Sequence, residues 1–294
     1  MRDQAERLRE LSEQIAYSDV SMNARVIAIA SGKGGVGKSN FAANLALQMC
    51  KLGKKVVIID ADFGLANIEI LLGVAPKFSV SDVLNGKVDI EDALTQGPLG
   101  CLFLSGGSGL AAINDVSDAQ IKRLTNGFLS LDSQADCIII DTRAGLSNAV
   151  INFIQAAADA IVITTPDPTA IADAYALLKS IRKSMPELEQ VKLVVNSVSN
   201  KEEAEEVFGK LKAVSARFLS IELNFLGSIP YDPELIKAVR KQKPVSILYP
   251  YSESANSISA ICADLLDMEP KKKSTIQNFI LKLIGRFVAK GGVG

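Results

Sequence analysis

The sequence contains no histidine and no tryptophan. The lack of histidine excludes histidine general bases, Ser-His-Asp triads and histidine metal ligands. Cysteine is scarce: Cys50, Cys101, Cys137 and Cys262 are scattered, without the short spacing that is typical of a metal site. Most of them stand among apolar residues, so we expect reduced core side chains in a cytoplasmic protein.

Long apolar runs are also missing. No stretch of about twenty apolar residues occurs, so the sequence predicts no membrane-spanning helix. Met1 is followed by charged residues rather than by an apolar run, so we expect no secretory signal peptide. Hydrophobic residues nevertheless make up 48% of the 294 residues, which is enough for one large domain with a sizeable core.

Acidic residues are absent from residues 271–294, although the whole chain has a net charge of −1. The charged residues of this stretch are all basic: Lys271, Lys272, Lys273, Lys282, Arg286 and Lys290. The rest of the chain is therefore acidic. An acidic body argues against nucleic acid as a partner, and a basic tail favours an anionic target.

The most informative stretch is the glycine-rich segment SGKGGVGKS, residues 31–39. An apolar run, Val26–Ala30, precedes it and predicts a buried strand, and residues 41–49 fit a helix. Strand, glycine-rich turn and helix form the context that a phosphate-binding loop requires. A turn that binds nothing is the alternative, but it explains neither the spacing nor the Gly-Lys-Ser ending.

The residue types of this loop fit the chemistry of a nucleoside triphosphate. Gly34, Gly35 and Gly37 let several backbone N–H groups converge on one anion, and the helix N-terminus adds partial positive charge. Lys38 would bridge the β- and γ-phosphates, and the Ser39 hydroxyl would bind Mg²⁺.

Acidic residues end two further apolar runs. Asp60 and Asp62 close the predicted strand at residues 54–62, and Asp141 closes another at residues 136–141. Continuous apolar runs that alternate with helices predict a parallel sheet covered on both faces, with ligands bound where the strands end. Asp141 fits a Walker B carboxylate that holds Mg²⁺ through water. A helix cap followed by turn residues is the alternative for Asp60 and Asp62.

Lys33, directly before Gly34-Gly35, resembles the signature lysine of the deviant-Walker ATPases, the MinD and ParA group. The resemblance implies that Lys33 reaches across a sandwich dimer and contacts the nucleotide of the partner subunit. The alternative is a solvated lysine without such a role. It also implies that Asp62 orients the attacking water and Asp60 supports the Mg²⁺ shell. Arg143 departs from the group, where that position of the second switch is usually small or apolar.

The same resemblance extends to the adenine side of the site. It implies that Asn196 reads the adenine edge and that residues 226–232 lie beside the ring. The expected catalytic residues are Lys33, Lys38 and Asp62, and the expected Mg²⁺ site consists of Ser39, Asp60 and Asp141. The expected nucleotide-binding residues are Gly32, Lys33, Gly34, Gly35, Val36, Gly37, Lys38, Ser39, Asn40, Asn196, Pro230, Tyr231 and Asp232.

The first residues carry a second resemblance. Asp3, Gln4, Ala5, Leu8 and Arg9 form an Asp-Gln-Ala-x-x-Leu-Arg pattern that resembles the N-terminal motif of the FlhG family, the flagellar branch of the MinD-like ATPases. The resemblance implies that residues 1–22 engage the signal-recognition-type GTPase FlhF. From the pattern alone, a weak amphipathic helix and a disordered leader are both possible.

Residues 271–294 predict a basic amphipathic helix behind a lysine cluster. One helical face is apolar throughout: Ile276, Phe279, Ile280, Leu283, Ile284, Phe287 and Val288. This pattern favours an anchor on an anionic membrane surface. Docking of the helix on the body of the chain, or on a partner, is the alternative.

Together these observations predict a doubly wound α/β fold, with a mostly parallel sheet and helices on both faces, over about residues 24–268. The expected parts are a GTPase activator segment (1–22), a MinD-like ATPase domain (23–270) and a membrane-targeting helix (271–294). The implied activity is Mg²⁺-dependent hydrolysis of ATP to ADP and phosphate. ATP would favour a homodimer on the inner face of the cell membrane, and ADP a cytoplasmic monomer.

The implied biology is control of the number and placement of flagella, through FlhF and flagellar switch-complex proteins. Two other members of the group are the alternatives. A division-site MinD has no reason to carry the N-terminal motif, and a ParA-type partitioning ATPase would need a basic body. A scaffold without activity is disfavoured because Lys33, Lys38, Asp62 and Asp141 are all present.

Overall fold

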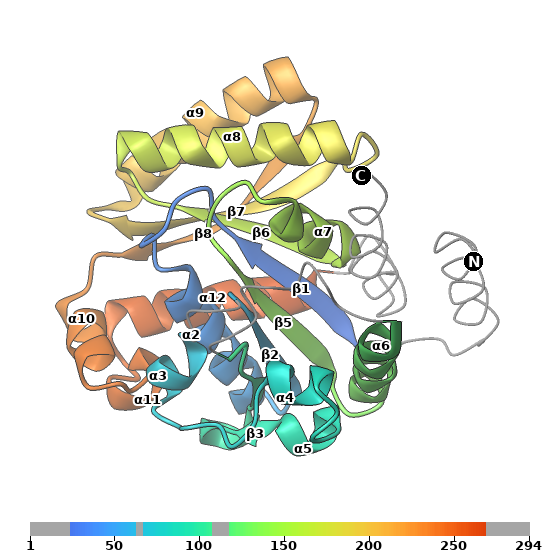
Figure 1. Ribbon diagram of the computed structural model, residues 1–294. Coiled ribbons are helices and arrows are strands. Elements are labelled where there is room, and N and C mark those ends of the chain that lie inside the picture. Colours follow the sequence, from blue (N-terminus) through green and yellow to red (C-terminus); the bar gives the residue numbers. More distant parts are fainter. Residues whose placement is uncertain (1–23, 63–66, 108–117, 269–294) are drawn as a thin grey trace, which may run out of the picture.

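The computed structural model describes residues 24–62, 67–107 and 118–268 (Figure 1). The expected GTPase activator segment and the expected membrane-targeting helix lie outside these residues. Within them, no helix is long and apolar enough to cross a membrane. Cys101, Cys137 and Cys262 are buried, Cys50 is partly exposed, and all four cysteines are free, which confirms the expectation of reduced core residues.

The core of the molecule is an eight-stranded sheet with the order β3-β4-β2-β5-β1-β6-β7-β8. Neighbouring strands run parallel except for β3 and β4, which pair antiparallel. The mostly parallel sheet of the prediction is therefore confirmed. The strands are β1 (Arg25–Ala30), β2 (Val56–Ala61), β3 (Thr95–Gln96), β4 (Leu102–Leu104), β5 (Cys137–Thr142), β6 (Asp159–Thr164), β7 (Gln190–Val198) and β8 (Glu222–Pro230).

Helices cover both faces of the sheet, which explains why β2, β5 and β6 are buried along their whole length. One apolar cluster lies under α4 to α9, and a second lies under α2, α3 and α12. Figure 1 shows α8 and α9 on one side of the sheet and α2 and α12 on the other. The helices are α2 (Lys38–Lys51), α3 (Ile68–Leu72), α4 (Val80–Leu84), α5 (Ile90–Ala93), α6 (Asp118–Asp132), α7 (Asn148–Ala156), α8 (Pro168–Ser184), α9 (Lys201–Leu219), α10 (Pro233–Arg240), α11 (Val245–Leu248) and α12 (Glu253–Asp267), with a 3₁₀ turn η1 at Pro98–Gly100.

The register of the central strands brings the acidic strand ends together. Asp60 of β2 pairs with Asp141 of β5, and Ala61 pairs with Thr142. On the other side of β5, Ile29 of β1 pairs with Asp141, so the loop that follows β1 emerges beside both carboxylates. This edge, formed by the carboxyl ends of β1, β2 and β5, is where a doubly wound sheet binds its ligand.

Candidate functional site

The glycine-rich loop forms an open cradle between β1 and α2. Gly35 and Gly37 have φ angles of +81° and +91°, a conformation that other residues rarely adopt. A Cβ atom on Gly34 or Gly35 would meet no atom within 4 Å, so the backbone is free on its outer side. By contrast, a Cβ atom on Gly37 would lie 2.3 Å from Asn196 Nδ2. The loop therefore requires glycine both for its path and for its packing.

The cradle opens into a cavity of about 430 Å³. Its walls come from the loop, from the ends of β2 and β5, and from α3 and α10. The lining residues are Ser31, Lys33, Gly34, Gly35, Gly37, Lys38, Ser39, Asn40, Asp62, Asn67, Ile70, Leu71, Ala144 and Val239. A cavity of this size, walled by an amide cradle at a helix N-terminus, suits a polyphosphate group.

Lys38 and Asp141 form a buried ion pair at the floor of the cradle. Lys38 Nζ lies 2.5 Å from Asp141 Oδ1, and the lysine side chain is 8% exposed while that of Asp141 is fully buried. The other carboxylate oxygen, Oδ2, is buried without a hydrogen-bond partner in the described part of the chain. Burial raises the pKa of Asp141, and the nearby Lys38 and Ser39 lower it less.

This arrangement fits a magnesium ion bound together with a nucleotide. Mg²⁺ keeps several waters and takes one or two protein oxygens besides phosphate oxygens. The unpartnered Oδ2 of Asp141, with the Ser39 hydroxyl beside the same carboxylate, supplies such a donor set. The described residues contain no cluster of three or more His, Cys, Asp or Glu that could hold a metal on its own. Mg²⁺ would thus depend on phosphate oxygens and water for most of its inner ligands.

Both carboxylate oxygens of Asp60 accept hydrogen bonds from backbone N–H groups. Its two oxygens accept N–H groups from Asp62 (3.1 Å), Asn67 (2.9 Å) and Ile68 (3.2 Å), so it closes the first turn of α3. Burial, and then the charge of Asp141, raise the pKa of Asp60 to about 7, although the three N–H groups lower it. Asp60 thus makes the contacts of a helix cap, which was the alternative to a role in the Mg²⁺ site. Its support of Mg²⁺ stays a prediction.

Lys33 contacts its own chain at the mouth of the cavity. Its Nζ lies 2.8 Å from Asp167 Oδ2 and 2.5 Å from Thr169 Oγ1, and its side chain is 38% exposed. The ammonium of Lys33 lowers the pKa of Asp167 to about 2. Asp167 is the N-cap of α8, so the first turn of that helix holds the lysine. Lys33 is therefore paired rather than simply solvated.

The loop also packs closely against α8 at Gly32. A Cβ atom there would lie 2.1 Å from the backbone oxygen of Asp173, so only glycine fits. Two neighbouring loop residues, Gly32 and Lys33, thus contact α8. These contacts hold the loop against α8.

The residues expected on the adenine side lie outside the lining of the cavity. Asn196 Nδ2 donates to the Val36 carbonyl at 2.8 Å and so joins the end of β7 to the loop. Tyr231 is 61% exposed. Asp232 is nearly buried: its Oδ1 caps α10 through Glu234 N–H at 2.8 Å, and its Oδ2 accepts the Ser254 hydroxyl at 2.6 Å. In this structure Asp232 therefore serves α10 and α12.

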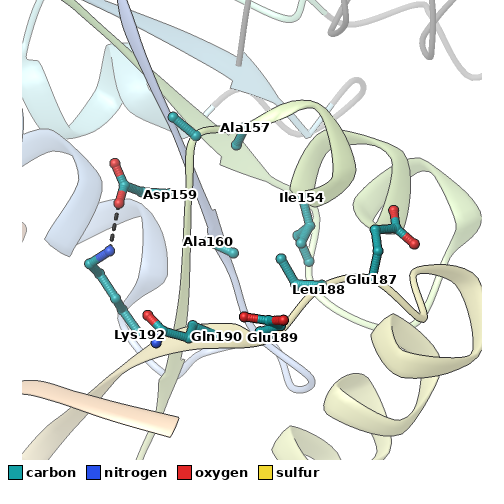
Figure 2. A pocket seen from close by; sticks show the side chains of 10 residues that line it. Ile154, Ala157, Asp159, Ala160, Glu187, Leu188, Glu189, Gln190 and Lys192 are labelled. Atoms are coloured by element: carbon teal, nitrogen blue, oxygen red, sulfur yellow. Dashed lines mark hydrogen bonds and ion pairs between the residues drawn. The ribbon is translucent and has the colours of Figure 1, made fainter. Parts of the chain in front are cut away.

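A second cavity, of about 260 Å³, lies at the opposite edge of the sheet, where β6 and β7 begin (Figure 2). Ile154, Ala157 and Leu188 give it apolar walls, and Asp159 and Lys192 bound it on one side. Lys192 Nζ pairs with Asp159 Oδ1 at 2.6 Å. Asp159 and Lys192 are therefore already paired within the chain, and Glu187 and Glu189 also line this cavity.

Comparisons with known proteins agree with this geometry. The family model described as "ParA: NUBPL iron-transfer P-loop NTPase" matches residues 23–266. The chain is 34% identical to the antiactivator FleN of Pseudomonas aeruginosa, over 88% of this chain and 93% of that protein. It is 32% identical to the flagellum site-determining protein YlxH of Helicobacter pylori, over 97% and 99%. The chain belongs to the FlhG-type MinD-like ATPases of the ParA family.

The fold of this FlhG-type ATPase is similar to solved MinD structures. The septum site-determining protein MinD of Pyrococcus horikoshii OT3, complexed with Mg-ADP, superposes with a TM-score of 0.67 at 25% identity. The match covers 83% of this chain and 96% of that one. The doubly wound P-loop fold and the nucleotide as ligand class follow from these relatives.

Sequence reasoning missed several residues of the FlhG-type site. Asn67, Ile70 and Leu71 of the α3 region and Val239 of α10 line the cavity, yet no local pattern marks them. A sequence pattern does mark one partner of Lys33. Asp167 followed by Pro168 is a typical helix start, and it predicts a carboxylate at the end of β6. Because the end of β6 lies beside the loop, the sequence could have predicted the pairing of Asp167 with Lys33.

Proposed function

We propose that this ATPase alternates between an ADP-bound monomer in the cytoplasm and an ATP-bound dimer on the inner face of the cell membrane. The observation that carries the proposal is the position of Lys33. It stands at the mouth of the cavity, is partly exposed, and is held by an exposed carboxylate instead of a buried one. A cation in this position can exchange Asp167 for the phosphates of a second subunit at little cost.

Hydrolysis would use the residues of the cradle in distinct roles. Lys38 exchanges Asp141 Oδ1 for the β- and γ-phosphates, and the backbone N–H groups of the loop hold the same phosphates. Asp141 and Ser39 hold Mg²⁺, which when bound neutralises the charge that develops on the phosphates. Asp62, in the cavity wall, orients the attacking water. Phosphoryl transfer needs little help from a strong base, so the lack of histidine is no obstacle.

We propose a flagellar role for this switch. The support is the relative YlxH, which is named as a flagellum site-determining protein. Residues 1–22 would engage the GTPase FlhF, and flagellar switch-complex proteins would be further partners. A pull-down with purified FlhF, using the chain with and without residues 1–22, tests the first of these contacts.

Residues 271–294 would attach the dimer to the membrane. One apolar face and six cations give a single tail weak affinity, and two tails on one dimer bind more firmly through their raised effective concentration. Sedimentation with anionic vesicles tests this step. The protein should pellet with ATP and much less with ADP, and removal of residues 271–294 should release it.

The switch itself is tested by comparing two lysines. Lys38→Ala should abolish tight binding of ADP and ATP, because the phosphates lose their main cation. Lys33→Ala should leave ADP affinity nearly intact and block the ATP-dependent dimer. Calorimetry gives the affinities, and analytical ultracentrifugation gives the dimer. Lys87→Ala, which opens an exposed ion pair on α4, is the matched control. Equal loss of ADP affinity in both loop variants would refute the division of roles.

A further inference from the structure

The register of the sheet places Arg143 beside Asp62. β2 and β5 pair as far as Ala61 and Thr142, and the next residue of each strand is Asp62 and Arg143. Arg143 Nε lies 3.8 Å from Asp62 Oδ1. The two side chains therefore meet across neighbouring strand ends, two residues beyond the Asp60–Asp141 pair.

The two partners differ in exposure. The Arg143 side chain is 66% exposed, whereas that of Asp62 is 15% exposed and belongs to the wall of the cavity. An ion pair with one partner so exposed contributes little to folding. Its effect falls instead on the orientation of the less exposed partner, Asp62.

Asp62 needs a counter-charge because a like charge stands behind it. Asp62 follows two residues after Asp60, whose strand partner is Asp141, so three carboxylates gather at this end of the sheet. Like charges so placed repel one another, and Asp62 lies in the wall of the cavity. The cations of the loop are engaged elsewhere, Lys38 with Asp141 and Lys33 with Asp167. The guanidinium of Arg143 opposes the repulsion from the outer side.

We propose that Arg143 is a positioning residue, which holds the Asp62 carboxylate in the cavity wall in the orientation that receives the attacking water. The inference deepens the proposed function and rests on the assignment of Asp62 to that water. Arg143 acts through Asp62, because Asp62 lines the cavity and Arg143 is not among its lining residues. Its effect therefore appears in turnover and not in ATP binding.

A double-mutant cycle with Asp62 tests the inference. Arg143→Ala should lower kcat about fivefold to tenfold, with the KM for ATP changed less than about twofold, since a misplaced water-binding group slows the chemical step. Arg143→Lys keeps a cation in place and should recover most of the loss. Asp62→Asn should lower kcat further, and adding Arg143→Ala to it should change nothing more. Lys87→Ala, an equally exposed cation of an ion pair remote from the cavity, should behave as wild type.

Three outcomes would overturn the inference, and each has a different meaning. If Asp62→Asn lowers kcat and Arg143→Ala does not, Asp62 keeps its role and needs no positioning by Arg143. If Arg143→Ala lowers kcat equally with Asp62 and with Asn at that position, the arginine acts on the nucleotide directly. If Asp62→Asn leaves kcat unchanged, the proposed role of Asp62 fails together with the inference. Thermal melting of each variant shows whether it is folded.

Discussion

Two buried carboxylates, at opposite ends of the parallel strands of the sheet, have different surroundings. Asp159, where β6 begins, has both oxygens engaged: Oδ2 with Arg25 Nε and Oδ1 with Lys192 Nζ, each at 2.6 Å. Asp141, near the end of β5, has Oδ1 paired with Lys38 and Oδ2 without a partner in the described chain. The fully paired carboxylate joins three strands, and the half-paired one faces the cradle.

The difference separates a structural from a functional charge. A buried charge costs free energy unless it is paired and hydrogen-bonded. At Asp159 that cost is offset within the chain, and Arg25 also donates to the Met268 carbonyl at 2.9 Å, which ties β1 to the end of α12. At Asp141 the cost is only partly offset, and a bound ion can supply the rest. The comparison thus predicts that the same substitution mainly lowers turnover at Asp141 and mainly lowers stability at Asp159.

The largest effect is expected for Asp141→Asn. Turnover should fall by about 100-fold to 1,000-fold, because the site loses a charge that acts on the phosphates through Mg²⁺. The free energy of unfolding of the nucleotide-free protein should fall by less than in Asp159→Asn, because one buried cation, Lys38, loses its anion here and two lose theirs there. Phosphate release and urea unfolding measure the two quantities. Retained turnover together with a large loss of stability would show that Asp141 has a structural role and not a functional one.

Asp159→Asn should mainly lower stability. It leaves two mostly buried cations, Arg25 and Lys192, without their anion, and the free energy of unfolding should fall by about 2–4 kcal/mol. The kcat per folded molecule should stay unchanged, because Asp159 is remote from the cradle. Denaturant unfolding and steady-state turnover at low temperature check both points. Lys87→Ala, the exposed counterpart, should cost less than about 1 kcal/mol.

The two regions also differ in how far the sequence predicts them. The cradle follows from a contiguous motif, and the strand ends at Asp60 and Asp141 follow from apolar runs, so the fold and the phosphate side were predicted. Asp159, Arg25 and Lys192 belong to three strands that are far apart in the sequence. Their pairing depends on the strand order, which no local pattern encodes.

A resemblance can also hide a local signal. Asp232 was expected beside the adenine ring, yet Asp232-Pro233-Glu234 is a typical helix start. The structure gives Asp232 that capping role for α10. Lys33 shows the converse, because its motif predicted a contact with a second subunit, while its contact with α8 within the chain depends on tertiary packing.

The titration of Asp60 completes the comparison of paired and unpaired carboxylates. Its pKa of about 7 lies above the ordinary value of 3.8. Between these two values the folded, nucleotide-free protein binds more protons than the unfolded chain does. Its contribution to stability is therefore lost progressively as the pH rises from about 4 to about 7, and it changes little above that.

The charge of Asp141 is the second cause of this shift, after burial, so Asp141→Asn should lower the pKa of Asp60 without returning it to 3.8. The same variant should then make the stability of the nucleotide-free protein depend less on pH between 4 and 7. Carboxyl ¹³C NMR of the two proteins gives the midpoints, and urea unfolding at pH 5 and pH 8 gives the stabilities. A wild-type midpoint below 5 would show that the three N–H donors outweigh burial and the neighbouring charge. An unchanged midpoint in Asp141→Asn would show that the two carboxylates do not interact.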